Sequence, residues 1–414
     1  MNQKEIPDSA IETVALHINE RNNRQANIPI SGPDDNTETP HYFETVHFNN
    51  IDNTFANYFA IDGSCNSQEF YNGLSIALYT AGYVCYQNGK QIRLNETDDP
   101  IILGKGYFPN NILITNQEHS YAIFDELLNL EPVKKLLEFF NVSDTNKIWG
   151  FGETTRDLVS TNNSKLLSFC QEILEWSLVY EISELPLAKE GDFILRDGTL
   201  RSNNIKQEYL IKLGKHLNEK MLICAAVTKN SPLKLELSST FKKIDNYLQT
   251  TKKPTYPFTT NDPKRQKLCC WFEVPDDILD VAYKGGMYAK KGITGGRGFG
   301  LFFATRLDYV EKLQNYDWVV VDLNIYDIIP NIPANCNERN IEKIKKIFLE
   351  LTRLTQEHYI LGYPYPLVEA HSFVTLKKNF KEEIINRVKF ALYKDQQMDN
   401  VDIENLFLDI HDRF

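Results

Sequence analysis

Short apolar runs that end on an acidic residue recur in the pattern of hydrophobic and polar positions along the chain. Residues 58–61 precede Asp62-Gly63-Ser64, and residues 193–196 precede Asp197-Gly198-Thr199. Runs of this length predict short strands, and the glycine predicts that the backbone turns away directly after the acid. Each strand would then carry a carboxylate to its end. Asp-Gly between apolar residues is also a strong hairpin signal, so one copy alone more often marks a turn than a ligand site.

The apolar spacing elsewhere predicts a chain with both strands and helices. Helical spacing occurs at residues 8–20, 122–140, 164–182, 340–359 and 380–392. Strand-like runs occur at residues 73–79, 82–90, 221–227 and 318–322, and Asn88-Gly89 is a hairpin-turn signal. Strands at the start and helices between the later strands predict an α/β fold, with a mixed sheet that begins as a meander and is flanked by helices.

Changes in sequence texture divide the chain into four predicted segments. These are an N-terminal extension with a helix and a polar linker (residues 1–47), the first part of the main body (residues 48–240), an insertion with local basic charge (residues 241–300), and the remainder of the body with a C-terminal helix (residues 301–414).

The predicted insertion places lysines and arginines among prolines and glycines. Lys290, Lys291 and Arg297 are candidates for contacts with a nucleic-acid backbone, and a solvated surface explains them about equally well. Residues 295–300 are glycine-rich but lack the strand-turn-helix context of a dinucleotide loop. The sequence Gly-x-x-x-x-Gly-Lys-Ser/Thr does not occur, so the chain carries no P-loop of its own.

Composition limits the class of protein. The chain has 414 residues, of which 42% are hydrophobic and 12% aromatic, so it can bury a sizeable core. Its formal net charge of -11 argues against a protein that coats nucleic acid over its whole surface, although a basic channel on an acidic exterior stays compatible. The seven cysteines include no Cys-x-x-Cys pair, which argues against a zinc site or a disulfide framework. With no apolar signal region at the N-terminus and no run of membrane-span length, we expect a cytoplasmic protein without a membrane partner.

A third motif lies near the C-terminal end, at residues 362–371. It reads Gly362-Tyr363-Pro364-Tyr365-Pro366-Leu367-Val368-Glu369-Ala370-His371. Two prolines stiffen the backbone, and Pro366 can begin a short helix. This geometry would fix Tyr363 relative to His371. A lone histidine is more often a surface or core residue than a ligand, but His371 follows rigid prolines and a nearby phenol.

The three motifs together resemble those of the NurA nuclease family, in the same order and with the same wide separation, over roughly residues 50–375. The third motif is fairly specific, whereas the first two are weak when taken singly. The resemblance implies an RNase H-like core and a ring-shaped homodimer. It also implies a nuclease that cuts DNA with manganese beside a hexameric HerA-type ATPase, which feeds it DNA ends.

The resemblance also implies a metal centre of three acids. Asp62, Asp197 and a glutamate of the preceding helix would hold Mn²⁺ or Mg²⁺, and Glu175 is our choice among the helix glutamates. It lies 22 residues before Asp197, a slightly longer gap than the family leads us to expect. Glu172 and Glu181 remain alternatives on the same helix.

The remaining candidate residues follow from the same resemblance. His371 would complete the metal shell or transfer a proton, because imidazole suits manganese and titrates near neutrality. Tyr363 would position a phosphate oxygen or stack near the DNA end. Lys229, in a segment that resembles a basic stretch of the family, would offset phosphate charge.

The expected activity is a metal-dependent 5′ to 3′ exonuclease with some single-strand endonuclease activity; the polarity comes from the resemblance alone. DNA repair and defence against invading DNA both stay open. One alternative is a non-catalytic scaffold or DNA clamp for the ATPase. Another is a phosphotransferase of the actin and sugar-kinase type, but its turns usually carry a residue between the acid and the glycine, which are adjacent here.

Overall fold

The structure is a computed structural model. It describes residues 8–23, 30–31, 41–42, 44–48, 56–70, 75–92, 110–114, 130–143, 145–148, 163–202, 204–250, 267–275, 278–279, 282, 300–307, 318–324, 341–356, 362–375, 378–395 and 400–407.

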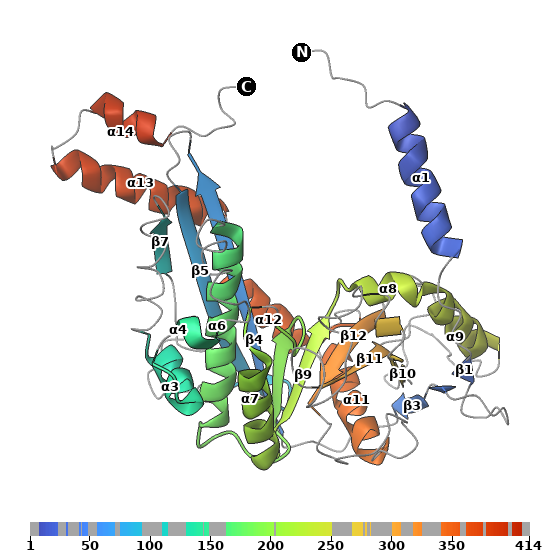
Figure 1. Cartoon of the computed structure of the whole chain (residues 1–414). Coiled ribbons are helices and arrows are strands. Elements are labelled where there is room, and N and C mark those ends of the chain that lie inside the picture. The colour runs from blue at the N-terminus through green and yellow to red at the C-terminus, as the bar shows by residue number, and fades with distance from the viewer. Residues whose placement is uncertain are drawn as a thin grey trace.

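A ten-stranded sheet is the centre of the described part of the chain (Figure 1). Its strands run in the order β3 (Glu44–Phe48), β10 (Lys267–Glu273), β11 (Leu301–Arg306), β12 (Trp318–Leu323), β9 (Ile223–Thr228), β8 (Phe193–Asp197), β4 (Asn57–Glu69), β5 (Ser75–Gln87) and β6 (Lys90–Gln91), while β7 (Asn110–Ile114) also pairs with β5. The β4–β8 and β8–β9 pairs are parallel. The other pairs in this sheet are antiparallel. A separate short parallel pair joins β1 (Ile30–Ser31) to β2 (His41–Tyr42).

Helices cover both faces of this sheet. The described helices are α1 (Asp8–Asn23), α3 (Glu131–Phe140), α4 (Thr145–Ile148), α6 (Asn163–Ser183), α7 (Gln207–Glu219), α8 (Pro232–Glu236), α9 (Ser238–Thr250), α11 (Ile341–Gln356), α12 (Tyr365–Val374), α13 (Lys378–Asp395) and α14 (Asn400–Leu406). Helices α3, α6 and α7 form one core with β4, β5 and β8, whereas α11 and α12 form another with the opposite face. The expected mixed sheet flanked by helices is therefore confirmed. No described helix combines the length and apolar content needed to cross a bilayer.

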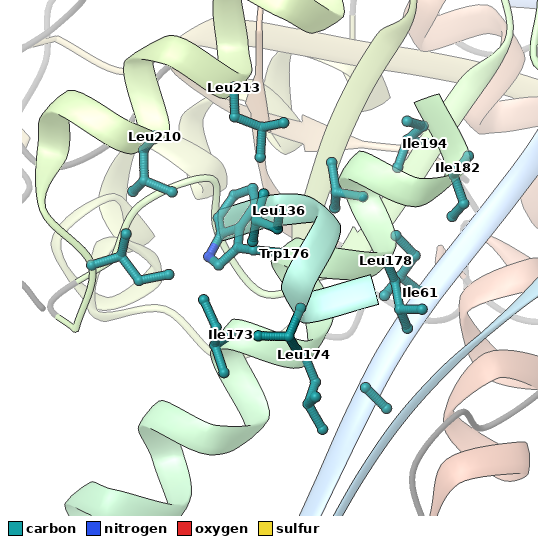
Figure 2. Packing of buried hydrophobic residues seen from close by; sticks show 14 of the residues in the cluster. Ile61, Leu136, Ile173, Leu174, Trp176, Leu178, Ile182, Ile194, Leu210 and Leu213 are labelled. Carbon is teal, nitrogen blue, oxygen red and sulfur yellow. The ribbon is translucent and has the colours of Figure 1, made fainter. Parts of the chain in front are cut away.

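The alternation of side chains along β4 and β8 divides the core between these faces. Ile61 and Ile194 point toward α6, where they pack with Trp176 and its neighbours (Figure 2). Ala60 and Leu195, one position away on each strand, belong to the cluster on the α12 side. Successive strand residues point to opposite faces. The side chains that come next along β4 and β8 therefore also alternate between the α6 side and the α12 side of the sheet.

Several predicted elements agree with the structure. The predicted N-terminal helix is α1, the predicted helix at residues 164–182 is α6, and the strand that ends on Asp197 is β8. The Asn88-Gly89 turn is present, with positive φ at both residues, which a type I′ hairpin turn requires.

Other predicted elements differ from the structure. The strand through Asp62 does not end there, because β4 continues to Glu69 in register with β5. The runs at residues 73–79 and 82–90 are mostly one long strand, β5, since Gly82, which begins the second run, pairs with Asp62 without turning the chain. Of the helix expected at residues 122–140, only α3 lies in the described part, and it begins where Pro132 occupies a first-turn position.

The segment expected as an insertion contributes a strand to the sheet. Within residues 241–300, β10 pairs with β11 on one side and β3 on the other. Its alternating Cys270 and Phe272 are buried against α8 and α9, so burial explains why this stretch joins the core. Strand β3 likewise extends from the predicted N-terminal extension into the sheet. Lys290, Lys291 and Arg297 lie outside the described residues, so their expected DNA contacts stay a prediction.

Asp322 on β12 ties the sheet to the segment after β8. Its Oδ2 accepts a hydrogen bond from the Leu200 backbone N–H at 3.0 Å and lies 3.5 Å from Nε of Arg201, and both charged side chains are 1% exposed. Burial raises the pKa of Asp322 to about 6, although Arg201 offsets part of this effect.

The raised pKa of Asp322 predicts that protein stability depends on pH, and that Asp322→Asn removes this contribution to the pH dependence. The native-state value of about 6 lies above the ordinary 3.8, so between these values the native protein binds a proton that the unfolded chain lacks. The free energy of unfolding should therefore rise, relative to the variant, as pH falls from about 6 to about 4, by on the order of 1–3 kcal/mol. Urea unfolding of the wild type and of Asp322→Asn between about pH 4 and about pH 6 measures this difference. Free energies of unfolding that change equally with pH in both proteins would contradict the prediction.

Candidate metal centre

Asp62, Asp197 and His371 converge at one edge of the parallel part of the sheet. Each offers one ligand atom, and these atoms all lie within 4.8 Å of one another. The parallel ladder between β4 and β8 ends at the pair of Ile61 with Arg196. The next residues on these strands are Asp62 and Asp197, so adjacent strands deliver the two carboxylates side by side on the α12 face.

The geometry of α12 brings the imidazole to the carboxylates. Gly362 has φ +67°, and Pro364 then caps a helix with Pro366 in its first turn. Ala370 is fully buried against the sheet, so the next residue, His371, emerges at the edge of the packed face. Its Nδ1 lies 2.7 Å from Oδ2 of Asp62, and the His371 side chain is 58% exposed.

The electrostatics of the cluster suit a hard divalent cation. Burial raises the pKa of Asp62, the charge of Asp197 raises it further, and hydrogen bonds from His371 and the Gly63 backbone lower it. Two carboxylates this close repel each other unless a positive charge lies between them. Carboxylate oxygens and an imidazole nitrogen form a donor set that fits Mn²⁺ or Mg²⁺. The residues present therefore fit a divalent cation.

Tyr363 and Lys229 lie beside this cluster. The Tyr363 side chain is buried and its hydroxyl donates to the Val227 carbonyl at 3.2 Å. Burial raises the pKa of Tyr363 well above its ordinary value, and Asp197 adds to the effect. Nζ of Lys229 lies 3.8 Å from the centre of the Tyr363 ring, which is a cation–π contact.

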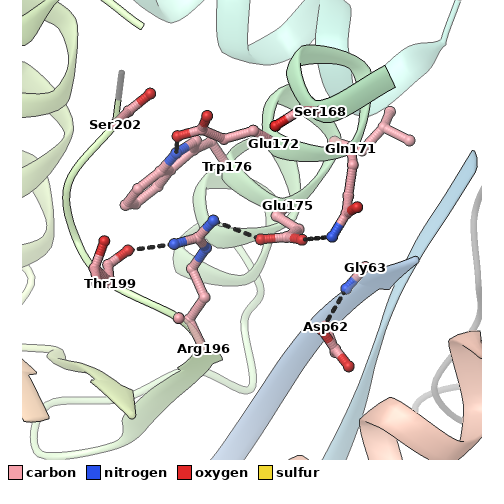
Figure 3. A network of polar contacts seen from close by, with 12 residues as sticks. Asp62, Gly63, Ser168, Gln171, Glu172, Glu175, Trp176, Arg196, Thr199 and Ser202 are labelled. Carbon is pink, nitrogen blue, oxygen red and sulfur yellow. Dashed lines mark hydrogen bonds and ion pairs between the residues drawn. The ribbon is translucent and has the colours of Figure 1, made fainter. Parts of the chain in front are cut away.

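Glu175 approaches the centre from the opposite face of the sheet. It lies on α6, and its carboxylate is bonded to Arg196 at 2.6 Å and to Gln171 at 2.8 Å (Figure 3). Glu175 lies outside the three-residue cluster but close to β4. Its Oε1 is so near Gly63, the residue after Asp62, that a Cβ built on this glycine would lie only 2.4 Å away. Burial raises the pKa of Glu175 to about 7, and Arg196 opposes that shift. Its expected role as a metal ligand stays a prediction.

The other two candidate glutamates of α6 face elsewhere. Glu172 accepts hydrogen bonds from the Trp176 indole at 3.2 Å and from the Asn204 amide at 2.6 Å. Burial raises the pKa of Glu181, while Lys135 of α3 lowers it, so this side chain lies toward α3. Of the three glutamates, Glu175 is therefore the one whose carboxylate lies against β4 beside Asp62.

Arg196 and Gln171, which hold Glu175, were not among the site residues expected from the sequence. A signal was present, because Arg196 interrupts an apolar run in which every other strand residue before Asp197 is hydrophobic. Both residues line a polar cavity of about 300 Å³ between α6 and the segment after β8. Glu172, Glu175 and Arg201 also line the cavity, so its wall carries both acidic and basic groups.

Two solved structures of NurA are similar to this chain. The crystal structure of the NurA nuclease from Sulfolobus solfataricus covers 95% of this chain and 96% of its own chain, at 14% identity and a TM-score of 0.41. A second crystal structure of NurA covers 96% of this chain and 99% of its own, at 13% identity and a TM-score of 0.35. No family model and no curated protein matches the sequence. Both structures are of NurA, the family that the three motifs resemble.

Gly63 allows Glu175 to approach β4, which predicts the effect of Gly63→Ala. The added Cβ would lie 2.4 Å from Oε1 of Glu175 and 2.7 Å from Cγ of Gln171, so both side chains must move and the bonds that hold Glu175 must change. We expect a loss of stability of roughly 1–3 kcal/mol. We also expect a smaller rise in melting temperature on addition of Mn²⁺, which differential scanning fluorimetry measures.

Gly191→Ala is the matched control. Gly191 has φ +84°, and no heavy atom lies within 4 Å of the position of an added Cβ. Backbone strain should destabilise this variant by about 1 kcal/mol, but its response to Mn²⁺ should equal that of the wild type. Equal responses to Mn²⁺ in both variants, or a crystal structure of Gly63→Ala with Glu175 unmoved, would refute this account of Gly63.

Proposed function

We propose that this chain is a metal-dependent DNA nuclease of the NurA type. The convergence of Asp62, Asp197 and His371, from segments up to 309 residues apart in sequence, is the observation that carries the proposal. Two carboxylates on adjacent strands, with an imidazole beside them, provide oxygen and nitrogen ligands for phosphodiester hydrolysis with a divalent cation. Resemblance of the three motifs to the NurA family gives the substrate as DNA.

Each residue has a distinct role in this proposal. Asp62, Asp197 and Glu175 hold Mn²⁺ or Mg²⁺, with Glu175 approaching from the α6 side. A divalent cation bound there supplies positive charge that polarises the scissile phosphate and lowers the pKa of a water molecule. His371, as the exposed member of the cluster, either adds a ligand or moves a proton.

Tyr363 and Lys229 are proposed to orient the substrate. The Tyr363 hydroxyl lies near Asp197 and donates to the Val227 carbonyl, so it would exchange this hydrogen bond for one to a phosphate oxygen when substrate binds. The exposed Lys229 ammonium lies over the Tyr363 ring and can offset phosphate charge.

The wider setting follows from the resemblance. We propose 5′ to 3′ exonuclease activity with some single-strand endonuclease activity, in a cytoplasmic homodimer that works with a HerA-type hexameric ATPase. Both DNA end processing in repair and defence against invading DNA fit this activity. A non-catalytic scaffold for the ATPase would not need the centre to bind Mn²⁺, so metal binding distinguishes the two functions.

Single Asp62→Asn and Asp197→Asn variants test the centre. Each should lower the rate of DNA cleavage in Mn²⁺ by at least about 100-fold, because each removes a charged oxygen ligand. Affinity for DNA without divalent cation should not fall, because removing an acid reduces repulsion of phosphate. End-labelled DNA and a filter-binding assay measure the two quantities.

Asp402→Asn serves as the control, since Asp402 is an exposed acid on α14. This variant should cleave at the wild-type rate, and EDTA should abolish cleavage by both proteins. Retained cleavage by a protein carrying both Asp62→Asn and Asp197→Asn would exclude this active site. Absence of any cleavage by the wild type, together with no Mn²⁺-induced rise in melting temperature, would favour the scaffold.

A further inference from the structure

Arg196 and Asp197 are neighbours on β8 and therefore point to opposite faces of the sheet. Asp197 joins the cluster on the α12 face, whereas Arg196 reaches α6 and bonds Oε2 of Glu175 at 2.6 Å. Strand β8 thus supplies the candidate ligand Asp197 on one face of the sheet. On the other face it supplies Arg196, the partner of the candidate ligand Glu175. The Arg196 side chain is 9% exposed and the Glu175 side chain 4%, so water contributes little to this pair.

The Arg196 guanidinium is held on more than one side. Its Nη1 donates to the Thr199 carbonyl, and its central carbon lies 4.7 Å from the centre of the Trp176 ring (Figure 3). Trp176 is fully buried and its indole N–H is bonded to Glu172. A planar guanidinium fixed in this way offers Nη2 to Glu175 from one defined direction.

The position of Glu175 depends on this contact. Its Oε1 is bonded by the Gln171 amide and lies against the backbone of Gly63, while Oε2 is bonded by Arg196. Within the described part of the chain, Arg196 is the one cation that forms an ion pair with Glu175. A buried carboxylate that loses its close positive partner becomes strongly unfavourable, so it takes up a proton or leaves its position, and either change weakens it as a metal ligand.

We propose that Arg196 is a positioning residue that fixes the Glu175 carboxylate beside Asp62 and thereby completes the metal centre. The inference rests on the proposed nuclease function and goes beyond it, because it assigns a role to a residue that lies on the other face of the sheet from the cluster. Direct contact of Arg196 with a DNA phosphate is the competing role. It is disfavoured because both terminal nitrogens of the guanidinium are already bonded within the protein and the side chain is almost fully buried.

A double-mutant cycle with Arg196→Met and Glu175→Gln tests the proposal. If Arg196 acts through Glu175, either single variant should lower the cleavage rate by at least about tenfold. The double variant should then be no more than about threefold slower than Glu175→Gln alone. Arg196→Lys, which keeps the charge but not the planar fork, should fall between wild type and Arg196→Met.

A second readout does not depend on cleavage. The Mn²⁺-induced rise in melting temperature should be reduced in Arg196→Met and in Glu175→Gln to a similar extent, because both variants lose the same ligand. Simple removal of a cation near the centre would instead strengthen Mn²⁺ binding, so the sign of the change distinguishes positioning from a general charge effect.

Arg306→Met is the matched control for loss of a buried arginine. Arg306 is 1% exposed, forms an ion pair with Asp245 and lies on β11, away from the centre. This variant should melt at a lower temperature than the wild type but retain its Mn²⁺ response and its cleavage rate per folded molecule. If Arg196→Met does not fold, the cycle is run with Arg196→Lys, for which the same non-additivity is expected.

The outcomes separate this proposal from the proposed function. Arg196 acts independently of Glu175 if its replacement slows the Glu175→Gln variant as much as it slows the wild type. Positioning is also refuted if Arg196→Met keeps the full Mn²⁺ response. In both cases cleavage that requires Asp62 and Asp197 would leave the nuclease function intact. Conversely, a wild type that never cleaves DNA while Arg196→Met still weakens Mn²⁺ binding would remove the function and retain the positioning role.

Discussion

The proximity of Asp62 to Asp197 is the constraint on which the rest of the site depends. Both carboxylates offer an atom to a cluster only 4.8 Å across, and burial together with their mutual repulsion raises the pKa of Asp62. Such an arrangement costs free energy unless a cation is bound, so the surrounding fold must hold it in place. Two cores do this, one on each face of the sheet, because side chains of β4 and β8 are packed on both sides directly before the acids.

The same strand geometry explains why the site has components on two faces. Strand alternation gives Asp197 to the α12 face and Arg196 to the α6 face, one residue apart. A change in the height or tilt of β8 therefore moves a candidate ligand and the partner of Glu175 together. The polar contacts on the α6 side extend from Glu175 through Arg196 to the backbone at Thr199, so the turn after β8 is also part of this unit. The relative positions of the side chains in the cluster therefore depend on β8 and on the two cores that pack against it.

The sequence predicted the elements whose signals are local. The apolar periodicity of α6, the Asn88-Gly89 turn and the proline-led start of α12 each follow from a few neighbouring residues, and the structure has all three. The extent of β4 was not predictable in this way, because it continues past Asp62 by pairing with β5, and such pairing depends on a distant segment. Arg196 was missed for a related reason. A charged residue within an apolar run has a meaning only when its partner on another element is known.

The two Asp-Gly pairs show that one motif can serve two physical purposes. Gly198 has φ +113°, so it turns the chain after β8 as the sequence predicted, and an L-residue would be strained there. Gly63 lies within the continuous β4–β5 ladder, and its lack of a side chain instead leaves room for the Glu175 carboxylate. Substitution of Gly198 alters the path of the backbone, whereas substitution of Gly63 alters only the approach of α6 to the strand. The repeated dipeptide thus arises from two separate requirements of the same centre, namely a bend beyond one acid and an open face beside the other.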